Sequence, residues 1–424
     1  MIDNLITKIK KIYYRFRLCL IKFSSNTNQY NNVLYLSEQI KLYGKLVDVD
    51  KVCAANSDVL HIIKPERMKI PFVRIINNGV EDKIGIRCWK LNEYKLSNRI
   101  KTTKRPLLYS ANKFIYWQNG FLYKQTFDGI IQLSAYQLDD FMYSDMEYAE
   151  GWYALRSGGT IMISSDLQNW KEIYRGKRGI KNSMCFCGSG KNLSLLFIEY
   201  TPGVVRERHK VWKYSVLAED LSIIKEFYTE KEHITQGLFP CARHIHVIMK
   251  DPFTGDLYVG TGDSDIESGI YCSKDNGKTF ELLFWGKQDY RALSFIFTKN
   301  AVFWNTDTHE SQAIYRILRK DMAQKKVTRF PLVNGALWCS LKYPIKINGC
   351  DFYIMSSNSE GALFDNYNRV YGIKIDNDVP VFYELIKKRS RTCYSQLFIL
   401  GLDINNRIYF YDHEIGVTYS YMLC

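Results

Sequence analysis

Residues 244–285 read HIHVIMKDPFTGDLYVGTGDSDIESGIYCSKDNGKTFELLFW, and this stretch decides the fold. It contains short runs rich in β-branched and aromatic residues, which favour extended strands over helices. Polar turn residues separate the runs, and Asn276-Gly277 forms one of the strongest short hairpin signals. The stretch therefore predicts short antiparallel strands joined by tight turns.

The same pattern continues from about residue 105 to the end of the chain. Candidate strands of four to seven residues, such as 113–117, 152–155 and 301–304, alternate with turns such as Asn119-Gly120 and Asp128-Gly129. Regular spacing of this kind indicates a sandwich, a barrel or a propeller. Long amphipathic helical patterns are absent from this region, so we expect an all-β fold.

A specific turn motif chooses among these folds. Ser273, Asp275, Gly277, Thr279 and Phe280 fit the pattern Ser-x-Asp-x-Gly-x-Thr-Trp/Phe, which is known as the Asp-box. The Asp275 carboxylate can accept backbone N–H groups of the turn, Gly277 can adopt a positive φ, and Phe280 can cover the apolar edge. The motif predicts a tight turn between two strands and says little about activity.

A degenerate copy of this motif occupies residues 164–170, which read SSDLQNW. It lacks the glycine, and we expect Asn169 to take the left-handed conformation in its place. On these motifs the chain resembles the BNR/Asp-box proteins of the sialidase-like β-propeller superfamily, most specifically over residues 150–310. Members of that superfamily have four-stranded blades around a central axis, and many are glycosidases, lyases or glycan-binding modules.

The resemblance implies an all-β propeller of about seven four-stranded blades. We expect the domain to span 55–424, after a lead-in segment at 25–54 and an amphipathic helix at 1–24. The expected blades are 55–100, 105–138, 140–176, 181–230, 243–287, 290–330 and 345–388, with 391–422 closing the ring.

The N-terminal segment carries six cations and one acid within residues 1–23. On a helix, Lys8, Lys11, Arg15 and Lys22 fall on one face, opposite an apolar face. Two interpretations stay open: the helix lies on an anionic membrane surface, or it docks on protein. Neither exports the chain, so we expect a cytoplasmic protein that is peripheral on the inner face of the membrane under the first interpretation.

Composition narrows the classes of partner. The chain has 424 residues, 46% hydrophobic and 24% charged content, and a net charge of +14, which excludes a disordered or collagen-like protein. Its 11 cysteines include no Cys-x-x-Cys pair, which argues for reduced thiols rather than structural zinc. The cations beyond the N-terminus are scattered, so we expect no nucleic-acid partner and attribute the charge to an acidic ligand or a membrane surface.

Blade topology predicts where a site lies. The Asp-box joins the third and fourth strands of a blade, so the opposite face receives the start of each first strand and the loop after each second strand. This rule places acidic, basic and imidazole side chains together at one mouth of the central channel, on the face opposite the Asp-box turn. The expected catalytic residues are Glu199, His244, His246 and Asp263, and the expected substrate-binding residues are Tyr200, Gln288, Arg291, Asp307 and Glu360.

Each candidate also has a purely structural interpretation. His244 and His246 lie two residues apart on a strand, so their side chains project to the same side. In a site they would bind a metal, a carboxylate or a sugar hydroxyl. In the structural interpretation they only line the central channel. No cofactor is predicted, although a divalent metal at these histidines stays open. Glu199-Tyr200 resembles the Glu–Tyr pairing of sialidases, but adjacent strand residues face opposite sides, so we expect one of them in the site. Arg291 either grips a substrate carboxylate or pairs with a blade acid.

The function predicted from these residues is a carbohydrate-active propeller. It would act on or bind an acidic glycan or lipid-linked sugar in bacterial-type surface-polysaccharide metabolism, such as capsule or O-antigen. Sialidase activity itself is not predicted, because residues 72–76 read FVRII and lack the proline of the sialidase signature. Glycoside hydrolase, polysaccharide lyase and binding module stay open. The alternative is a non-catalytic scaffold for membrane-associated glycosyltransferases.

Overall fold

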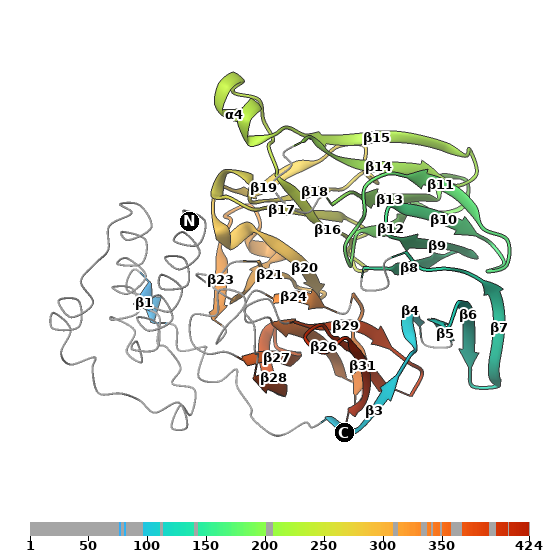
Figure 1. Cartoon of the computed structure of the whole chain (residues 1–424). Helices are drawn as coiled ribbons and strands as arrows, with labels where there is room; N and C mark the ends of the chain where they lie inside the picture. The colour runs from blue at the N-terminus through green and yellow to red at the C-terminus, as the bar shows by residue number, and fades with distance from the viewer. Residues whose placement is uncertain are drawn as a thin grey trace, which may run out of the picture.

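A computed structural model shows a ring of seven antiparallel β-sheets, the architecture of a seven-bladed β-propeller (Figure 1). The structure describes residues 76–77, 80–81, 96–110, 113–139, 143–200, 207–307, 313–331, 337–340, 342–347, 350–357, 367–389, 396–405 and 407–423. The predicted helix at 1–24, the lead-in segment and most of the expected blade at 55–100 lie outside these residues. Among the described residues, no helix is both long and apolar enough to traverse a lipid bilayer.

Each blade is a meander whose first strand lies innermost. The blades are numbered here in chain order. Blade 1 consists of β4 (Arg105–Ser110), β5 (Lys113–Gln118), β6 (Phe121–Thr126) and β7 (Gly129–Ala135). Blade 2 consists of β8 (Asp145–Ala149), β9 (Trp152–Ser157), β10 (Thr160–Ser164) and β11 (Lys171–Arg175). Blade 3 consists of β12 (Met184–Cys187), β13 (Ser194–Ile198), β14 (His209–Ser215) and β15 (Asp220–Phe227). The short helix α4 (Glu230–Gln236) follows β15.

The remaining blades follow the same plan. Their strands are β16 (His244–Lys250), β17 (Leu257–Gly262), β18 (Gly269–Ser273) and β19 (Glu281–Trp285) in blade 4; β20 (Ala292–Phe297), β21 (Ala301–Thr306), β22 (Ala313–Leu318) and β23 (Val327–Pro331) in blade 5; β24 (Leu337–Ser340), β25 (Ile345–Ile347), β26 (Cys350–Ser357), β27 (Tyr367–Asp376) and β28 (Val379–Arg389) in blade 6; and β29 (Leu397–Leu402), β30 (Arg407–Asp412) and β31 (Val417–Leu423) in blade 7.

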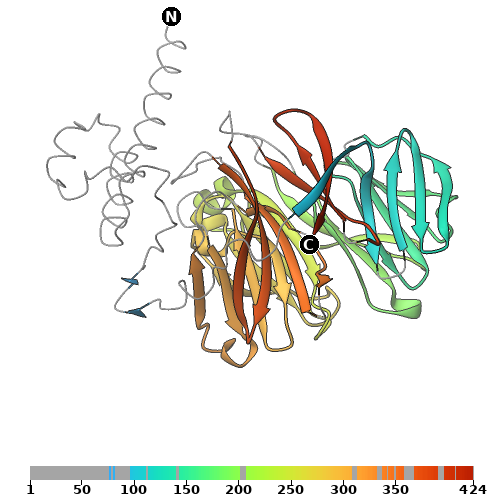
Figure 2. The same ribbon diagram turned by 90° about the horizontal axis from the view of Figure 1, so that it is seen from below.

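The ring closes by pairing the two ends of the described chain. The outer strand of blade 7 is β3 (Leu96–Thr102), which runs antiparallel to β31 with Thr102 opposite Thr418. Figure 1 shows β3 in cyan beside β31 in red, and Figure 2 shows the cyan strands next to the red ones from below. The structure differs here from the expected blade at 55–100, because residues 96–102 complete the last blade. This pairing covers the edge of β31 and ties the ring together.

Blade 6 also differs from the expectation of a blade beginning at residue 345. Its innermost strand is β24, only four residues long, and β25 adds a fifth strand that pairs with β26. A strand this short has no measurable alternation of apolar and polar residues, so its sequence carries little signal. Outside the ring, β1 (Ile76–Asn77) pairs with β2 (Val80–Glu81).

The hydrophobic core consists of buried layers between neighbouring blades. Between blades 3 and 4, for example, Leu196, Ile245 and Val259 are fully buried against one another. Strands packed on both faces need near-continuous apolar sequence, which explains runs such as SLLFI in β13. Cys185, Cys187, Cys241 and Cys272 are buried free thiols, as expected from the composition.

Two Asp-box turns join third and fourth strands. Asp275 accepts hydrogen bonds from the backbone N–H and hydroxyl of Thr279, and Gly277 has φ of +83°. In the degenerate copy, Asp166 accepts the backbone N–H groups of residues 168 and 169, and Leu167 takes the positive φ of 66°. The expectation for Asn169 was therefore wrong, because the strained position directly follows the aspartate in this turn.

Candidate functional site

The strand directions bring five sequence-distant segments to one face of the ring. His244 begins β16, Asp263 follows β17, Arg291 precedes β20, Asp307 follows β21 and Tyr200 follows β13. The Asp-box turn between β18 and β19 lies at the other end of blade 4, as the register of its antiparallel strands requires. We call the face that carries these five residues the upper face.

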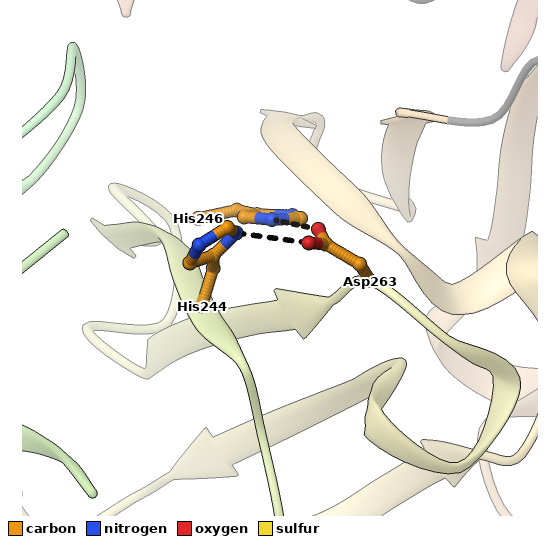
Figure 3. Close-up of side chains that lie close together, drawn as sticks. All are labelled: His244, His246 and Asp263. Carbon is orange, nitrogen blue, oxygen red and sulfur yellow. Dashed lines mark ion pairs between the residues drawn. The ribbon is translucent and has the colours of Figure 1, made fainter. Parts of the chain in front are cut away.

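Asp263 is the centre of the cluster. Its Oδ2 lies 3.1 Å from Nδ1 of His244, and its Oδ1 lies 3.3 Å from Nε2 of His246 (Figure 3). Both imidazoles come from β16, and both point toward the carboxylate in Figure 3. The same Oδ1 accepts a hydrogen bond of 2.8 Å from a terminal nitrogen of Arg291.

A β-bulge aims one of these histidines. His244 pairs with Gly262 and Ile245 with Thr261, but the next paired residue is Val247, opposite Gly260. His246 is thus the extra residue of a bulge, and simple alternation along the strand does not set its direction. Bulges commonly redirect side chains next to functional sites. Both histidines thus face the same carboxylate, and His246 does so through this irregularity.

Arg291 connects blades 4 and 5. The terminal nitrogen that binds Asp263 also donates to Oδ2 of Asp307 at 2.7 Å. Gln288 adds a hydrogen bond of 2.9 Å from its side-chain nitrogen to the backbone oxygen of Asp263. Arg291 therefore pairs with blade acids in this structure, which was one of its two expected roles.

The electrostatics of the cluster favour an ionised Asp263. Burial by itself would raise the pKa of this carboxyl. Hydrogen bonds from His244 and His246, followed by the charge of Arg291, outweigh burial and hold the pKa of Asp263 far below its usual range. For His246, burial lowers the pKa and the neighbouring Asp263 opposes that effect.

Tyr200 extends the cluster toward blade 2. Its ring lies 4.5 Å from the ring of His244, and the guanidinium of Arg178 lies 5.6 Å from its centroid. Burial raises the pKa of Tyr200, and the negative charges of Asp307 and Asp263 add to the rise. The tyrosine is therefore a neutral hydrogen-bonding group at the mouth rather than an activated nucleophile.

Glu199 does not join the cluster. Its carboxylate accepts hydrogen bonds from the Tyr174 hydroxyl and from the Trp212 indole nitrogen at 3.2 Å, within the layer between blades 2 and 3. Adjacent residues at the end of β13 point to opposite sides, so Tyr200 enters the site and Glu199 does not. Glu360 lies outside the described residues.

Three residues of this neighbourhood were missed from the sequence. Arg243 has its Nε 3.4 Å from Oδ2 of Asp263. The guanidinium of Arg178 lies 5.6 Å from the centroid of the Tyr200 ring, and the His209 ring lies 6.1 Å from that of His244. Arg243 directly precedes the first strand of blade 4, so the rule for the upper face should have included it. His209 begins a third strand, directly after the loop that follows the second strand, so the same rule should have included it.

An exposed aromatic pair lies against the loop that begins with Asp263. Phe239 and Trp285 are 40% and 38% exposed, with ring centroids 5.0 Å apart at an interplanar angle of 80°. The Trp285 indole donates a 2.6 Å hydrogen bond to the backbone oxygen of Ile266. Ile266 lies in the loop that begins with Asp263, and Trp285 is followed by the segment that carries Gln288 and Arg291.

Comparisons with known proteins do not assign a function to this chain. No family model and no curated protein matches this chain. Similar solved structures include "YCF48 bound to D1 peptide", with 9% identity, 78% of this chain and 97% of that chain covered, and a TM-score of 0.47. The extracellular domain of the putative hybrid two-component system BT4673 from B. thetaiotaomicron has 14% identity, a TM-score of 0.46, and 77% and 39% coverage.

A third similar structure is the GH74 xyloglucanase from Xanthomonas campestris, with 10% identity, a TM-score of 0.46, and 77% and 55% coverage. This chain thus spans well under two thirds of the length of the last two proteins. At such low identities, no argument about ligand or reaction rests on these similarities. The function has to be inferred from the site itself.

Proposed function

We propose that this propeller binds an acidic glycan at its upper face. The observation that carries the proposal is the continuous cluster of cationic, imidazole and phenolic groups from Arg178 through Tyr200 and His244 to Asp263, joined there by Arg243. Two guanidinium groups at one mouth favour a ligand that bears carboxylates. The chain's net charge of +14 acts in the same direction by attracting anions.

The aromatic pair supports a sugar rather than a small inorganic anion. A fixed, partly exposed indole offers a flat apolar surface for the C–H face of a pyranose ring. Because the Trp285 indole is hydrogen-bonded to Ile266, in the loop that begins with Asp263, one oligosaccharide can place a ring on the aromatic pair and a carboxylate near the arginines. The Asp-box turns further support kinship with sialidase-like propellers, and a place in surface-polysaccharide metabolism belongs to the same proposal.

We propose ligand binding only, and the proposal includes no cleavage of a glycosidic bond. Glu199, the expected acid of a Glu–Tyr pair, is engaged with Tyr174 and Trp212, and Tyr200 is held neutral. His244, His246 and Asp263 are the remaining groups with acid–base capacity in the cluster.

Calorimetric titration with uronate oligosaccharides and with neutral oligosaccharides of equal length tests the proposal. We expect binding of the uronate series only. Arg243→Ala and Tyr200→Ala should each weaken it about tenfold or more. Lys278→Ala is the matched control, since it removes an exposed cation from the Asp-box turn on the opposite face. A folded protein that binds no acidic glycan, or equal losses with Lys278→Ala, would refute the proposal.

The outer edge of blade 1 favours a second candidate function, a protein scaffold. In β7, the neighbouring Ile130 and Ile131 are each 56% exposed, and Phe127 is 73% exposed. Since neighbouring strand residues face opposite sides, apolar surface is presented on both faces of an outermost strand, as in docking by strand addition. Ile130→Asp should abolish co-purification of a membrane-associated glycosyltransferase partner while leaving glycan binding intact.

A further inference from the structure

We propose that His244, His246 and Asp263 together bind one divalent transition-metal ion. The inference does not depend on a glycan ligand, because it concerns three side chains whose donor atoms already face one another. One ring nitrogen of each histidine and one oxygen of the Asp263 carboxylate all lie within 4.8 Å of one another. They come from one edge of blade 4, the start of β16 and the loop after β17.

The distances between the donor atoms fit a metal site. A tetrahedral ion with bonds of about 2.0–2.1 Å requires its ligands to be about 3.3 Å apart. The two nitrogen–oxygen distances are 3.1 Å, from His244 to Oδ2, and 3.3 Å, from His246 to Oδ1. The donor nitrogens of the two histidines lie within 4.8 Å of each other. The three donors leave at least one coordination position open toward the mouth.

The neighbouring residues orient the carboxylate as a ligand. Arg291 binds Oδ1 of Asp263 at 2.8 Å, and Gln288 binds its backbone oxygen at 2.9 Å. Asp307 in turn holds Arg291 at 2.7 Å. Outer contacts of this kind fix ligating carboxylates in metal sites. The other oxygen, Oδ2, faces Nδ1 of His244 at 3.1 Å and also lies 3.4 Å from Nε of Arg243, so an ion bound there would share this oxygen with Arg243.

The donor set selects the class of ion. Two imidazoles and one carboxylate suit Zn²⁺, Co²⁺ or Mn²⁺, whereas Mg²⁺ and Ca²⁺ prefer oxygen ligands alone. The backbone leaves room for this arrangement only with glycine at position 262, where a Cβ would lie 2.5 Å from Cε1 of His246. The alternative to a metal is a hydrogen-bonded centre in which both imidazoles donate N–H groups to Asp263.

Titration of the chelator-treated full chain with ZnCl₂ and CoCl₂ distinguishes the two. We expect one equivalent of Zn²⁺, a visible Co²⁺ spectrum of low coordination number, and no effect of MgCl₂ at the same concentrations. His244→Ala and His246→Ala should each reduce Zn²⁺ affinity about 100-fold or more. His413→Ala is the matched control, since it removes an exposed histidine on blade 7.

Unchanged Zn²⁺ affinity in both site variants would overturn the proposal. Because a buried histidine variant can fail to fold, the wild-type chain provides a second test through ¹⁵N chemical shifts of the imidazoles. Zn²⁺ should move Nδ1 of His244 and Nε2 of His246 and leave His413 in place. Shifts confined to other histidines would overturn the proposal equally. Glycan titration in chelator reports on the proposed function separately.

Discussion

The ammonium of Lys342 and the carboxylate of Glu147 meet inside the ring, although they come from blades 6 and 2. Lys342 also donates to the backbone oxygen of Met184 in blade 3 at 2.7 Å. Both side chains are buried and border a cavity of about 70 Å³ next to the inner strands of blades 1 and 7. One lysine thus links blades that are far apart in sequence, across the centre of the propeller.

Breaking this pair should destabilise the whole ring. Lys342→Met leaves a buried carboxylate without its cation, and Glu147→Leu leaves a buried ammonium, so each should cost about 3–5 kcal/mol. The double variant removes both charges and should recover most of that loss. Chemical denaturation of the four proteins measures the coupling. Additive losses in the double variant would mean that the two residues act independently.

Because of the buried His209, we expect the stability of the folded protein to depend on pH. The residue is fully buried, and neither ring nitrogen has a hydrogen-bond partner among the described residues. Burial, followed by the charges of His244 and Lys177, lowers its pKa from 6.5 to about 4. Below pH 6.5 the unfolded chain therefore takes up a proton that the folded chain refuses until about pH 4.

Stability should consequently fall as the pH drops from 6.5 to 4, by about 3 kcal/mol in total, and should be unaffected above pH 6.5. Other groups oppose this trend: burial raises the pKa of Glu147 to about 7 despite Lys342. The test is therefore the difference in the free energy of unfolding between the wild type and His209→Leu, measured by denaturation at several pH values. A difference that stays constant from pH 7 to 4 would contradict the assignment.

Much of the ring follows from local sequence. Strands such as β5, β10 and β21 are predicted by runs of β-branched and aromatic residues between polar turns, because those residues fit pleated surfaces. Ring closure by β3 could not be predicted, since pairing with β31 depends on a contact between opposite ends of the described chain. The four-residue β24 gave no periodic signal.

The site could be predicted only in part, for the same physical reason. Topology alone places His244, Asp263, Arg291 and Asp307 on one face, and the structure brings them together. The bulge at His246 and the double pairing of Arg291 depend on backbone irregularity and side-chain reach, which residue spacing does not encode. For this reason Arg291→Ala should destabilise the protein, because it leaves the buried Asp307 without its cation.

The Asp-box turn predicts a modest, local effect on stability. Asp275→Ala removes the acceptor for the Thr279 backbone N–H at 2.9 Å and for the Ser273 hydroxyl at 2.8 Å. Because the turn is largely exposed, water replaces part of these bonds, and the cost should be about 1 kcal/mol. Thermal unfolding measures it, with Asp275→Asn as the conservative control. Ligand binding should survive, and its loss in a stable variant would reverse the assignment of faces.

The N-terminal segment predicts membrane association from its sequence pattern. Deletion of residues 1–23 removes the basic face with Lys8, Lys11 and Arg15, and should move the protein from the membrane fraction to the soluble fraction. Reversal of Lys11 and Arg15 to glutamate should have the same effect, since anionic lipid would then repel the segment. Circular dichroism controls for folding. Unchanged fractionation of a folded deletion variant would exclude the membrane anchor.

A substitution at Gly262 directly tests how closely the residues of the site are packed. A Cβ at this position would lie 2.5 Å from Cε1 of His246 and 2.7 Å from Cγ of Arg291, distances at which one neighbour must move. Both neighbours bind Asp263, so Gly262→Ala should disturb the centre of the cluster and cost about 1–3 kcal/mol.

The double variant Gly262→Ala with His246→Ala isolates the cause. Removing the imidazole opens the space that the new methyl group needs, so the added cost of Gly262→Ala should shrink in the His246→Ala background. Zn²⁺ binding should stay absent in the double variant, because one ligand is gone. If Gly262→Ala is equally costly in both backgrounds, the glycine is required by the backbone of β17 rather than by the packing of His246.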